Sequence, residues 1–240
     1  MNKDDILVCI ANHNSNQNAI QLKKGFGEYF DTIIIDSKST EISDEFDIKL
    51  DNVYYTGLVN ESINQSKIRK KQLVFFIASD VYVEDFEKIS QIIKTLPEDV
   101  YLWAPSSRGQ SHYHCKNFKS DGLREVPYLE GFTFLSNLAL FENLYPISTV
   151  QNLYGFGIDL TLGFNCIKKF NKICVVDDRI EVYHKEGTGY DQSRALNDMY
   201  RWMMSSSDLK LREYTVLYSQ SWDSKINSSD WKKLLNYLKS

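Results

Sequence analysis

The sequence predicts an α/β protein with a mostly parallel central sheet flanked by helices. Short apolar runs alternate with amphipathic segments through the first 80 residues, which is the rhythm of consecutive β-α-β units. Most of these runs end in acidic or hydroxyl residues, and an open α/β sheet binds ligands at the carboxyl ends of its strands. We expect residues 1–190 to form the main domain and residues 191–240 to form a helical extension packed on it.

The elements of the first half follow from apolar runs and from the polar residues that end them. Residues 17–30 are weakly amphipathic, and residues 58–71 end in cations, which suit a helix C-terminus. A stretch at 41–51 is acidic and is expected to be exposed. The expected strands are residues 6–11, 32–35, 53–55 and 73–78.

The second half contains a long polar segment at 105–125, which is interpreted as a functional loop or a mobile flap. A helix over 228–238 has one apolar face, which would dock on the core or lie on a membrane surface. The other expected elements are helices at 84–95, 137–144 and 154–170, strands at 100–104, 130–136, 173–176 and 180–183, and helices from residue 192 onward.

Composition excludes several classes of function. The chain has 240 residues and a net charge of −4, so nothing indicates general nucleic-acid affinity. Its four cysteines include no CxxC pair, so neither a zinc knuckle nor a redox pair is expected, and Cys9 and Cys174 lie in apolar runs typical of buried thiols. There is no apparent signal peptide or transmembrane run. We expect a cytoplasmic protein that can touch the inner face of a membrane.

Two acidic residues stand at the ends of expected strands. The buried run of residues 73–79 leads directly into Asp80, where a carboxylate is suited to bind Mg²⁺ or Mn²⁺ on a nucleotide diphosphate. The alternative is that Asp80 begins the next helix or lies in a turn. Asp36 ends the second strand and is placed to accept hydrogen bonds from a ribose or a base, or to form an Asx-turn.

Two later motifs supply further chemistry. Asp159 follows Gly155-Phe-Gly157, and a carboxylate at the mouth of a helix suits a general base, or alternatively a helix cap. His184 could ligate a divalent metal, or be a structural histidine at a strand end. The glycines at 187 and 189 that follow it suit a loop that closes over phosphates.

The remaining histidines are weaker candidates. His13 would reach a nucleotide from the end of the first strand, or lie in a solvated turn. His112 and His114 alternate, so an extended segment would place them on one face, but no carboxylate or cysteine pair adjoins them to favour a metal.

The order and spacing of these motifs resemble the GT-A fold glycosyltransferases, in particular the large inverting glycosyltransferase family 2 and its bacterial relatives. The resemblance covers roughly residues 5–190. The segments that carry it are 6–14, Ile33-Ile-Ile-Asp36-Ser-Lys-Ser39, Phe76-Ile-Ala-Ser-Asp80, Glu130-Gly-Phe-Thr-Phe-Leu-Ser136, Tyr154-Gly-Phe-Gly-Ile-Asp159 and Val182-Tyr-His184.

The resemblance implies a GT-A type, Rossmann-like sheet and a metal-dependent transferase. It makes Asp159 the base that deprotonates an acceptor hydroxyl, with inversion at the anomeric carbon. It makes Asp80 and His184 the ligands of Mn²⁺ or Mg²⁺. A cation such as Lys185 or Arg108 would help to hold the phosphates. The implied donor-contacting residues are Asn12, His13, Asp36, Ser37, Ser79, Asp80 and Lys185.

The resemblance also implies the partners. These are a nucleoside-diphosphate sugar, with UDP favoured, and a glycan or lipid-linked glycan in bacterial surface polysaccharide synthesis. One departure matters, because Ala78 replaces the first acid of the family's DxD element. The alternative function is therefore a non-catalytic nucleotide- or glycan-binding module on the same fold. A nucleotidyltransferase is a third reading, although the chain lacks an obvious glycine-rich, lysine-containing loop after its first strand.

Overall fold

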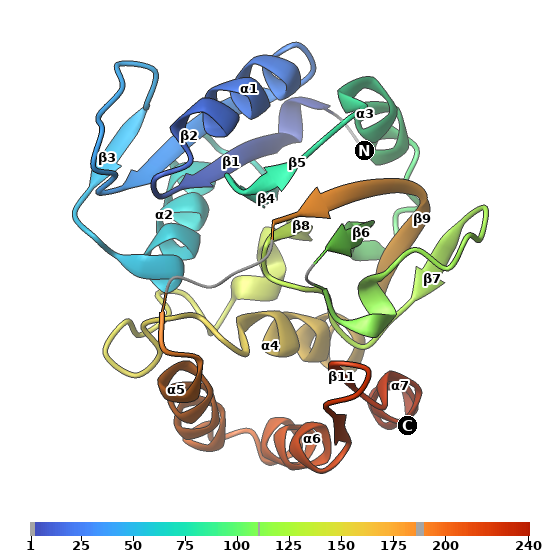
Figure 1. The fold of residues 1–240 in the computed structure, drawn as a ribbon. Helices are drawn as coiled ribbons and strands as arrows, with labels where there is room; N and C mark the ends of the chain where they lie inside the picture. Colours follow the sequence, from blue (N-terminus) through green and yellow to red (C-terminus); the bar gives the residue numbers. More distant parts are fainter. Residues whose placement is uncertain (1–2, 110, 186–189) are drawn as a thin grey trace.

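The computed structural model describes residues 3–109, 111–185 and 190–240, and it has a mixed central sheet with helices on both faces (Figure 1). Its strands are β1 (Ile6–Asn12), β2 (Asp31–Ser37), β3 (Ile48–Leu50), β4 (Leu73–Ala78), β5 (Val81–Tyr82), β6 (Val100–Gly109), β7 (Leu123–Glu125), β8 (Thr133–Asn137), β9 (Ile173–His184), β10 (Trp222–Asp223) and β11 (Ser228–Ser229). Its α-helices are α1 (Asn16–Gly27), α2 (Tyr54–Ile68), α3 (Phe86–Lys94), α4 (Ile158–Phe164), α5 (Gln192–Met204), α6 (Leu209–Gln220) and α7 (Trp231–Lys239).

The main sheet has the order β3-β2-β1-β4-β8-β6-β9-β5, with β7 also paired to β9. The first four strands are parallel, as the β-α-β rhythm predicted. Strand β8 runs antiparallel between β4 and β6, while β6 and β9 are parallel. Strands β5 and β7 pair antiparallel to β9. The predicted α/β class is therefore confirmed, and the antiparallel strands all come after β4.

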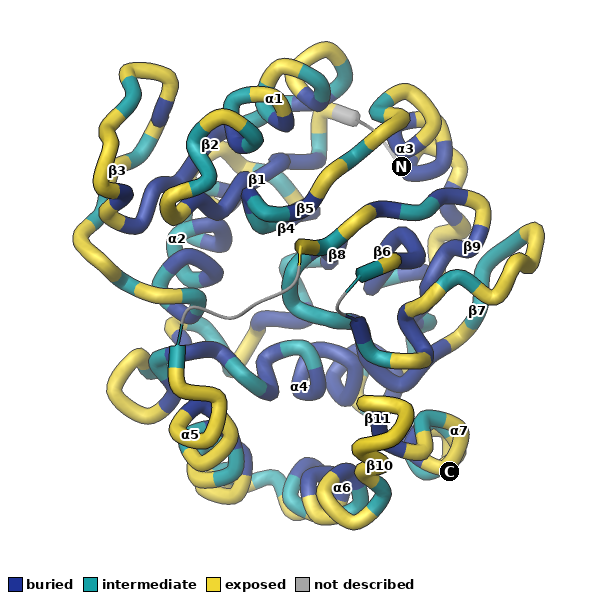
Figure 2. Tube along the Cα trace, in the orientation of Figure 1, coloured by how far each residue is buried: buried dark blue, intermediate teal, exposed yellow. Residues whose placement is uncertain are grey.

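The two faces of the sheet are covered by different helices because side chains alternate along each strand. In β1, Leu7 and Cys9 pack in a core with α2, α4 and the C-terminal helices, whereas Val8 and Ile10 pack with α1 and α3. Figure 2 shows the resulting pattern, with buried strands inside and exposed outer faces on α5 and α6. All seven residues of β1 are buried, as a doubly covered strand requires.

The third strand was predicted in the wrong place. Residues 53–55 were expected to form it, but the strand is Ile48–Leu50 and α2 begins at Tyr54. The stretch at 41–51 is also not wholly exposed, because Phe46 is buried and the carboxylate of Asp47 accepts a hydrogen bond of 2.7 Å from the backbone N–H of Ile34. An edge strand of only three residues is too short to show a clear alternation of apolar and polar residues in the sequence.

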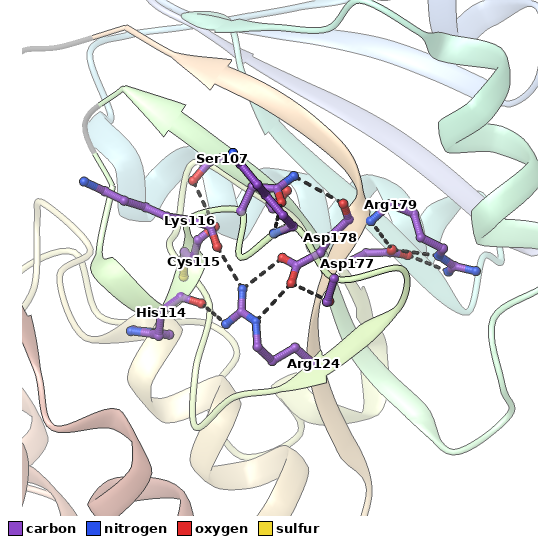
Figure 3. Close-up of polar contacts among 12 residues, drawn as sticks. Ser107, His114, Cys115, Lys116, Arg124, Asp177, Asp178 and Arg179 are labelled. Atoms are coloured by element: carbon purple, nitrogen blue, oxygen red, sulfur yellow. Dashed lines mark hydrogen bonds and ion pairs between the residues drawn. The ribbon is translucent and has the colours of Figure 1, made fainter.

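The segment at 105–125 is more ordered than a flap. Strand β6 continues through it to Gly109, and β7 closes its far end. Figure 3 shows the Arg124 guanidinium at its centre, donating 3.0 and 3.3 Å hydrogen bonds to the Asp178 carboxylate. The same guanidinium donates to the backbone carbonyls of His114 and Lys116. One buried ion pair thus fastens this segment to β9.

The two apolar runs expected at 173–176 and 180–183 form one strand, β9, which carries an irregularity opposite Pro105 and Ser106. Beyond residue 190, Met199, Leu211 and Leu234 join the same core cluster as α4. Helix α7 therefore docks on the core through its apolar face. No helix in the described part of the chain is both long enough and apolar enough to span a membrane. The division into two regions at residue 190 stays an expectation.

Candidate functional site

The ends of β1 and β2 form a tight polar network. Asn12 and Asp36 are register partners, and the Asn12 amide donates a 2.7 Å hydrogen bond to the Asp36 carboxylate. The second carboxylate oxygen accepts from the backbone N–H of Ser39 at 2.9 Å, which makes the Asx-turn geometry. Both Asn12 and Asp36 are buried. They brace the loop after β1, and a direct nucleotide contact from either of them stays a prediction.

His13 and Ser37 lie beside this network. The His13 Nδ1 atom is 2.7 Å from the backbone oxygen of Ser37, so the imidazole is fixed at the rim of the β1 and β2 ends. His13 itself is exposed. The Ser37 hydroxyl accepts a hydrogen bond of 3.0 Å from the backbone N–H of Val53, immediately before α2. Of these two residues, His13 is the one whose side chain a ligand can reach.

Asp80 and His184 meet, although 104 positions separate them in the chain. The pairing of β5 with β9 places Val81 opposite His184, and the His184 Nε2 atom lies 3.5 Å from the Asp80 Oδ2 atom. Phe132 stacks on the imidazole with ring centroids 4.1 Å apart and 15° between the planes, which fixes the orientation of the ring. The predicted pair is therefore brought together by the antiparallel edge of the sheet.

The residues around this pair are also placed by the backbone. The Lys185 backbone N–H donates to the Asp80 carbonyl at 3.3 Å, so the lysine begins directly beside the pair. Ser79 is buried, and its carbonyl accepts from the Asn18 amide at 2.8 Å. The glycines at 187 and 189, expected to close over phosphates, lie outside the described residues. Arg108 is paired with Glu84, and its Nε atom lies 3.7 Å from Glu181.

Asp159 lies in the first turn of α4. Gly157 precedes the helix with φ of +84°, a left-handed conformation that a residue without a side chain adopts without strain. The helix N-terminus favours an anionic side chain, and the backbone N–H of Leu160 donates to the Asp159 carboxylate at 2.8 Å. Burial nevertheless outweighs these effects and raises the pKa of Asp159 from 3.8 to about 6. This is the direction that suits a carboxylate acting as a base near neutral pH.

Tyr190 lies within electrostatic range of the carboxylates of both Asp80 and Asp159. Its pKa is raised to about 12, first by burial, then by the charge of Asp159 and then by the charge of Asp80. Both carboxylates therefore lie close enough to this one hydroxyl to act on it. The Tyr190 ring also stacks on Tyr154 at 4.9 Å, on the segment that leads into α4. Asp80 and His184 are therefore in contact and Asp159 lies within electrostatic range of the same tyrosine, and that the three form one catalytic site stays a prediction.

The sequence prediction assigned no role to the side chain of Tyr190 or of Glu130. The charge of Glu130 raises the pKa of Asp159, so the two carboxylates lie within electrostatic range of each other. Tyr190 directly follows the expected phosphate loop, and Glu130 begins the expected strand at 130–136, so position along the chain was a usable signal for both. Trp103 is fully buried, and its indole N–H donates a 3.1 Å hydrogen bond to Asp177.

The donor atoms present fit a metal ion only in part. Among the residues that the structure describes, no group of three His, Cys, Asp or Glu side chains is arranged to hold an ion. Asp80 and His184 supply two donors, and both side chains keep some exposure to solvent. Mg²⁺ and Mn²⁺ are often held by one or two side chains with substrate phosphates completing the shell. The pair therefore fits an ion that arrives with a diphosphate, not one caged by protein alone.

Solved structures with the same architecture are known, although no family model matches the chain and no curated protein matches its sequence. The crystal structure of S. aureus TarS 1–349 with UDP-GlcNAc aligns at a TM-score of 0.59 and 14% identity, covering 90% of this chain and 71% of that one. GalNAc-T7 with UDP, GalNAc and Mn²⁺ aligns at 0.58 and 11% identity, covering 97% of this chain and 54% of that one. The chain has the GT-A glycosyltransferase fold.

Proposed function

We propose that this protein transfers a sugar from a UDP-sugar to a hydroxyl group of a glycan or lipid-linked glycan, with inversion at the anomeric carbon. The observation that supports the proposal is the contact between Asp80 and His184, together with a Tyr190 hydroxyl that lies within electrostatic range of both Asp80 and Asp159. The choice of UDP is supported by the structural neighbours, which were crystallised with UDP or UDP-GlcNAc.

In the proposed reaction, the Asp159 carboxylate takes the proton from the acceptor hydroxyl. The acceptor oxygen forms the new bond to the anomeric carbon as the bond to the diphosphate oxygen breaks, and UDP leaves with that electron pair. The raised pKa of Asp159 makes its carboxylate basic enough to accept the proton, while the carboxylate remains ionised at pH 7. Direct displacement from the opposite face inverts the configuration.

The leaving diphosphate would be stabilised on the opposite side of the site. Asp80 and His184 are the residues that would hold a divalent ion, which would neutralise the charge that develops on the diphosphate. Phe132 keeps the His184 imidazole in place, and Lys185 begins within one residue of it. We further infer that the acceptor belongs to a bacterial surface polysaccharide and that the reaction takes place in the cytoplasm, in part at the membrane surface.

The test is release of UDP from a panel of UDP-sugars with Mn²⁺, with calorimetry of UDP binding alongside. Asp80→Asn should weaken Mn²⁺-dependent UDP binding at least tenfold, because it removes the one carboxylate donor of the pair. Glu84→Gln is the matched control, since Glu84 is an exposed acid near the same loop. Equal Mn²⁺-dependent UDP binding by the wild type and Asp80→Asn would show that Asp80 does not hold a metal ion.

A non-catalytic binding module is the second candidate, and the observation that favours it is Ala78 at the first position of the acidic motif. The same panel separates the two functions. An enzyme releases UDP over a prolonged incubation, and a binding module retains an intact donor.

A further inference from the structure

A cluster of four rings lies within electrostatic range of the candidate base Asp159, outside the predicted donor site. It consists of His112, Tyr128, Tyr218 and Trp222, and we refer to it as the aromatic platform. The His112 ring is 5.6 Å from Trp222 and 5.7 Å from Tyr128, and Tyr218 lies 5.9 Å from both Trp222 and Tyr128. Trp222 keeps 40% of its surface exposed, whereas Tyr128 and Tyr218 are buried, so the ring that the platform offers to a ligand is that of Trp222.

The hairpin that carries Trp222 is fastened to the core. Trp222 pairs with Ser229 across the β10–β11 ladder, and the Ser229 hydroxyl donates to the Tyr218 carbonyl at 3.0 Å. The neighbouring Ser228 hydroxyl is 3.1 Å from the Nδ1 atom of His114, and both residues are fully buried. The exposure of Trp222 is therefore imposed by an anchored hairpin, and its position relative to His112 is defined.

The platform adjoins the base in electrostatic terms as well. After burial, the charge of His112 has the largest effect on the pKa of Asp159, which it lowers. Burial raises the pKa of Tyr218, and the charges of Asp159 and Glu130 raise it further. The side chains of Glu130, His112 and Tyr218 are therefore all within electrostatic range of Asp159, in the first turn of α4.

This combination of groups matches the surface of a sugar ring. A pyranose has an apolar face of C–H groups, which packs on an aromatic ring, and a rim of hydroxyls, which donate to carboxylates. Glu130 and Asp159 place two carboxylates beside the platform, and two carboxylates oppose the approach of an anionic group. A neutral sugar can both pack on the aromatic ring and approach the two carboxylates, whereas the carboxylates would repel a phosphate-bearing acceptor.

We propose that the aromatic platform is the acceptor subsite and that it binds a neutral sugar ring stacked on Trp222, with a hydroxyl of that sugar directed to Asp159. This inference rests on the proposed transferase function and adds to it the chemical class of the acceptor.

The test compares Trp222→Ala with Ile226→Ala. Ile226 lies in the same hairpin and is 42% exposed, so it controls for disturbance of the hairpin itself. The probes are neutral methyl glycosides of glucose, galactose, N-acetylglucosamine and their β-linked disaccharides, with glucose 6-phosphate as the anionic probe. Binding is measured by saturation-transfer NMR and titration in the presence of UDP and Mn²⁺, and UDP binding is titrated separately on each variant.

The wild type should bind at least one neutral glycoside, and Trp222→Ala should weaken that binding about 3- to 10-fold. Trp222→Phe should recover part of it, and Ile226→Ala should match the wild type. Equal binding by Trp222→Ala, or binding of the phosphate probe alone, or no binding of any glycoside, would overturn the inference. UDP binding should be the same in all variants, and failure of the wild type to bind UDP would instead count against the transferase proposal.

Discussion

Replacing the candidate base should make the protein more stable while removing its activity. Asp159 has a pKa raised from 3.8 to about 6, so folding disfavours its ionised form. Two pKa units correspond to an upper limit of about 3 kcal/mol. Asp159 keeps some contact with solvent, which screens the effect, so we expect Asp159→Asn to stabilise the fold by about 1 to 2 kcal/mol at pH 7.5.

The pH dependence follows from the direction of the shift. Because the folded-state pKa lies above the unfolded value, the native state binds the proton more tightly, and the stability from this group is fully present below pH 3.8. That stability is lost as the pH rises through 6. The advantage of Asp159→Asn should therefore be complete above pH 7 and disappear as the pH approaches 4.

The assay is thermal unfolding of wild type and variant across this pH range, together with sugar transfer. A gain of about 1 to 2 kcal/mol corresponds to about 2 to 6 °C in Tm for a chain of this length. Turnover should fall about 10²- to 10⁴-fold, and kcat/KM of the wild type should rise with pH up to about 6 and then level off. Asp121→Asn, in an exposed turn, is the control and should change neither quantity. A lower Tm for Asp159→Asn at pH 7.5, or turnover above a tenth of wild type, would refute the reasoning.

Three further predictions concern the scaffold. Arg124→Gln should lower the free energy of unfolding, measured by urea titration, by about 3 to 5 kcal/mol, because it leaves the fully buried Asp178 carboxylate without its cationic partner. Arg108→Gln breaks an exposed pair and should lower it by less than about 1 kcal/mol. Equal losses in the two variants would contradict this account. Gly155→Ala should lower both Tm and turnover, because φ is +74° at this position and an added Cβ would lie 2.1 Å from the Tyr55 ring. An unchanged Tm would contradict this prediction, because it would mean that the turn accommodates the side chain. The four cysteines are all buried and free, and burial raises the pKa of each thiol. Ellman's reagent should therefore label them only after unfolding. Rapid labelling of the native protein would contradict this prediction.

Local patterns were sufficient for the first half of the chain. Leu73–Ala78 was predicted to the residue, and α1 and β2 within a few residues, because long apolar runs and amphipathic periods are written in consecutive positions. The segment at 105–125 was misjudged for the opposite reason. Its polar residues suggested a solvated loop, but their partners lie elsewhere: Ser106 donates to the Ile180 carbonyl at 2.8 Å and Arg124 binds Asp178. Polar side chains satisfied by distant partners leave no mark in the local sequence.

By itself, the sequence determined the α/β class, the order of the first strands and the positions of the three candidate chemical groups, since each depends on neighbours in the chain. Only the tertiary structure decided that Asp80 and His184 meet, because that contact requires an antiparallel edge strand whose partner lies 100 residues away. The surroundings of Asp159 were likewise undecided until α4, the Glu130 segment and the C-terminal helices packed together. The physical reason is that burial and charge act through space, so the pKa of a carboxylate depends on every group around it and not on its place in a motif.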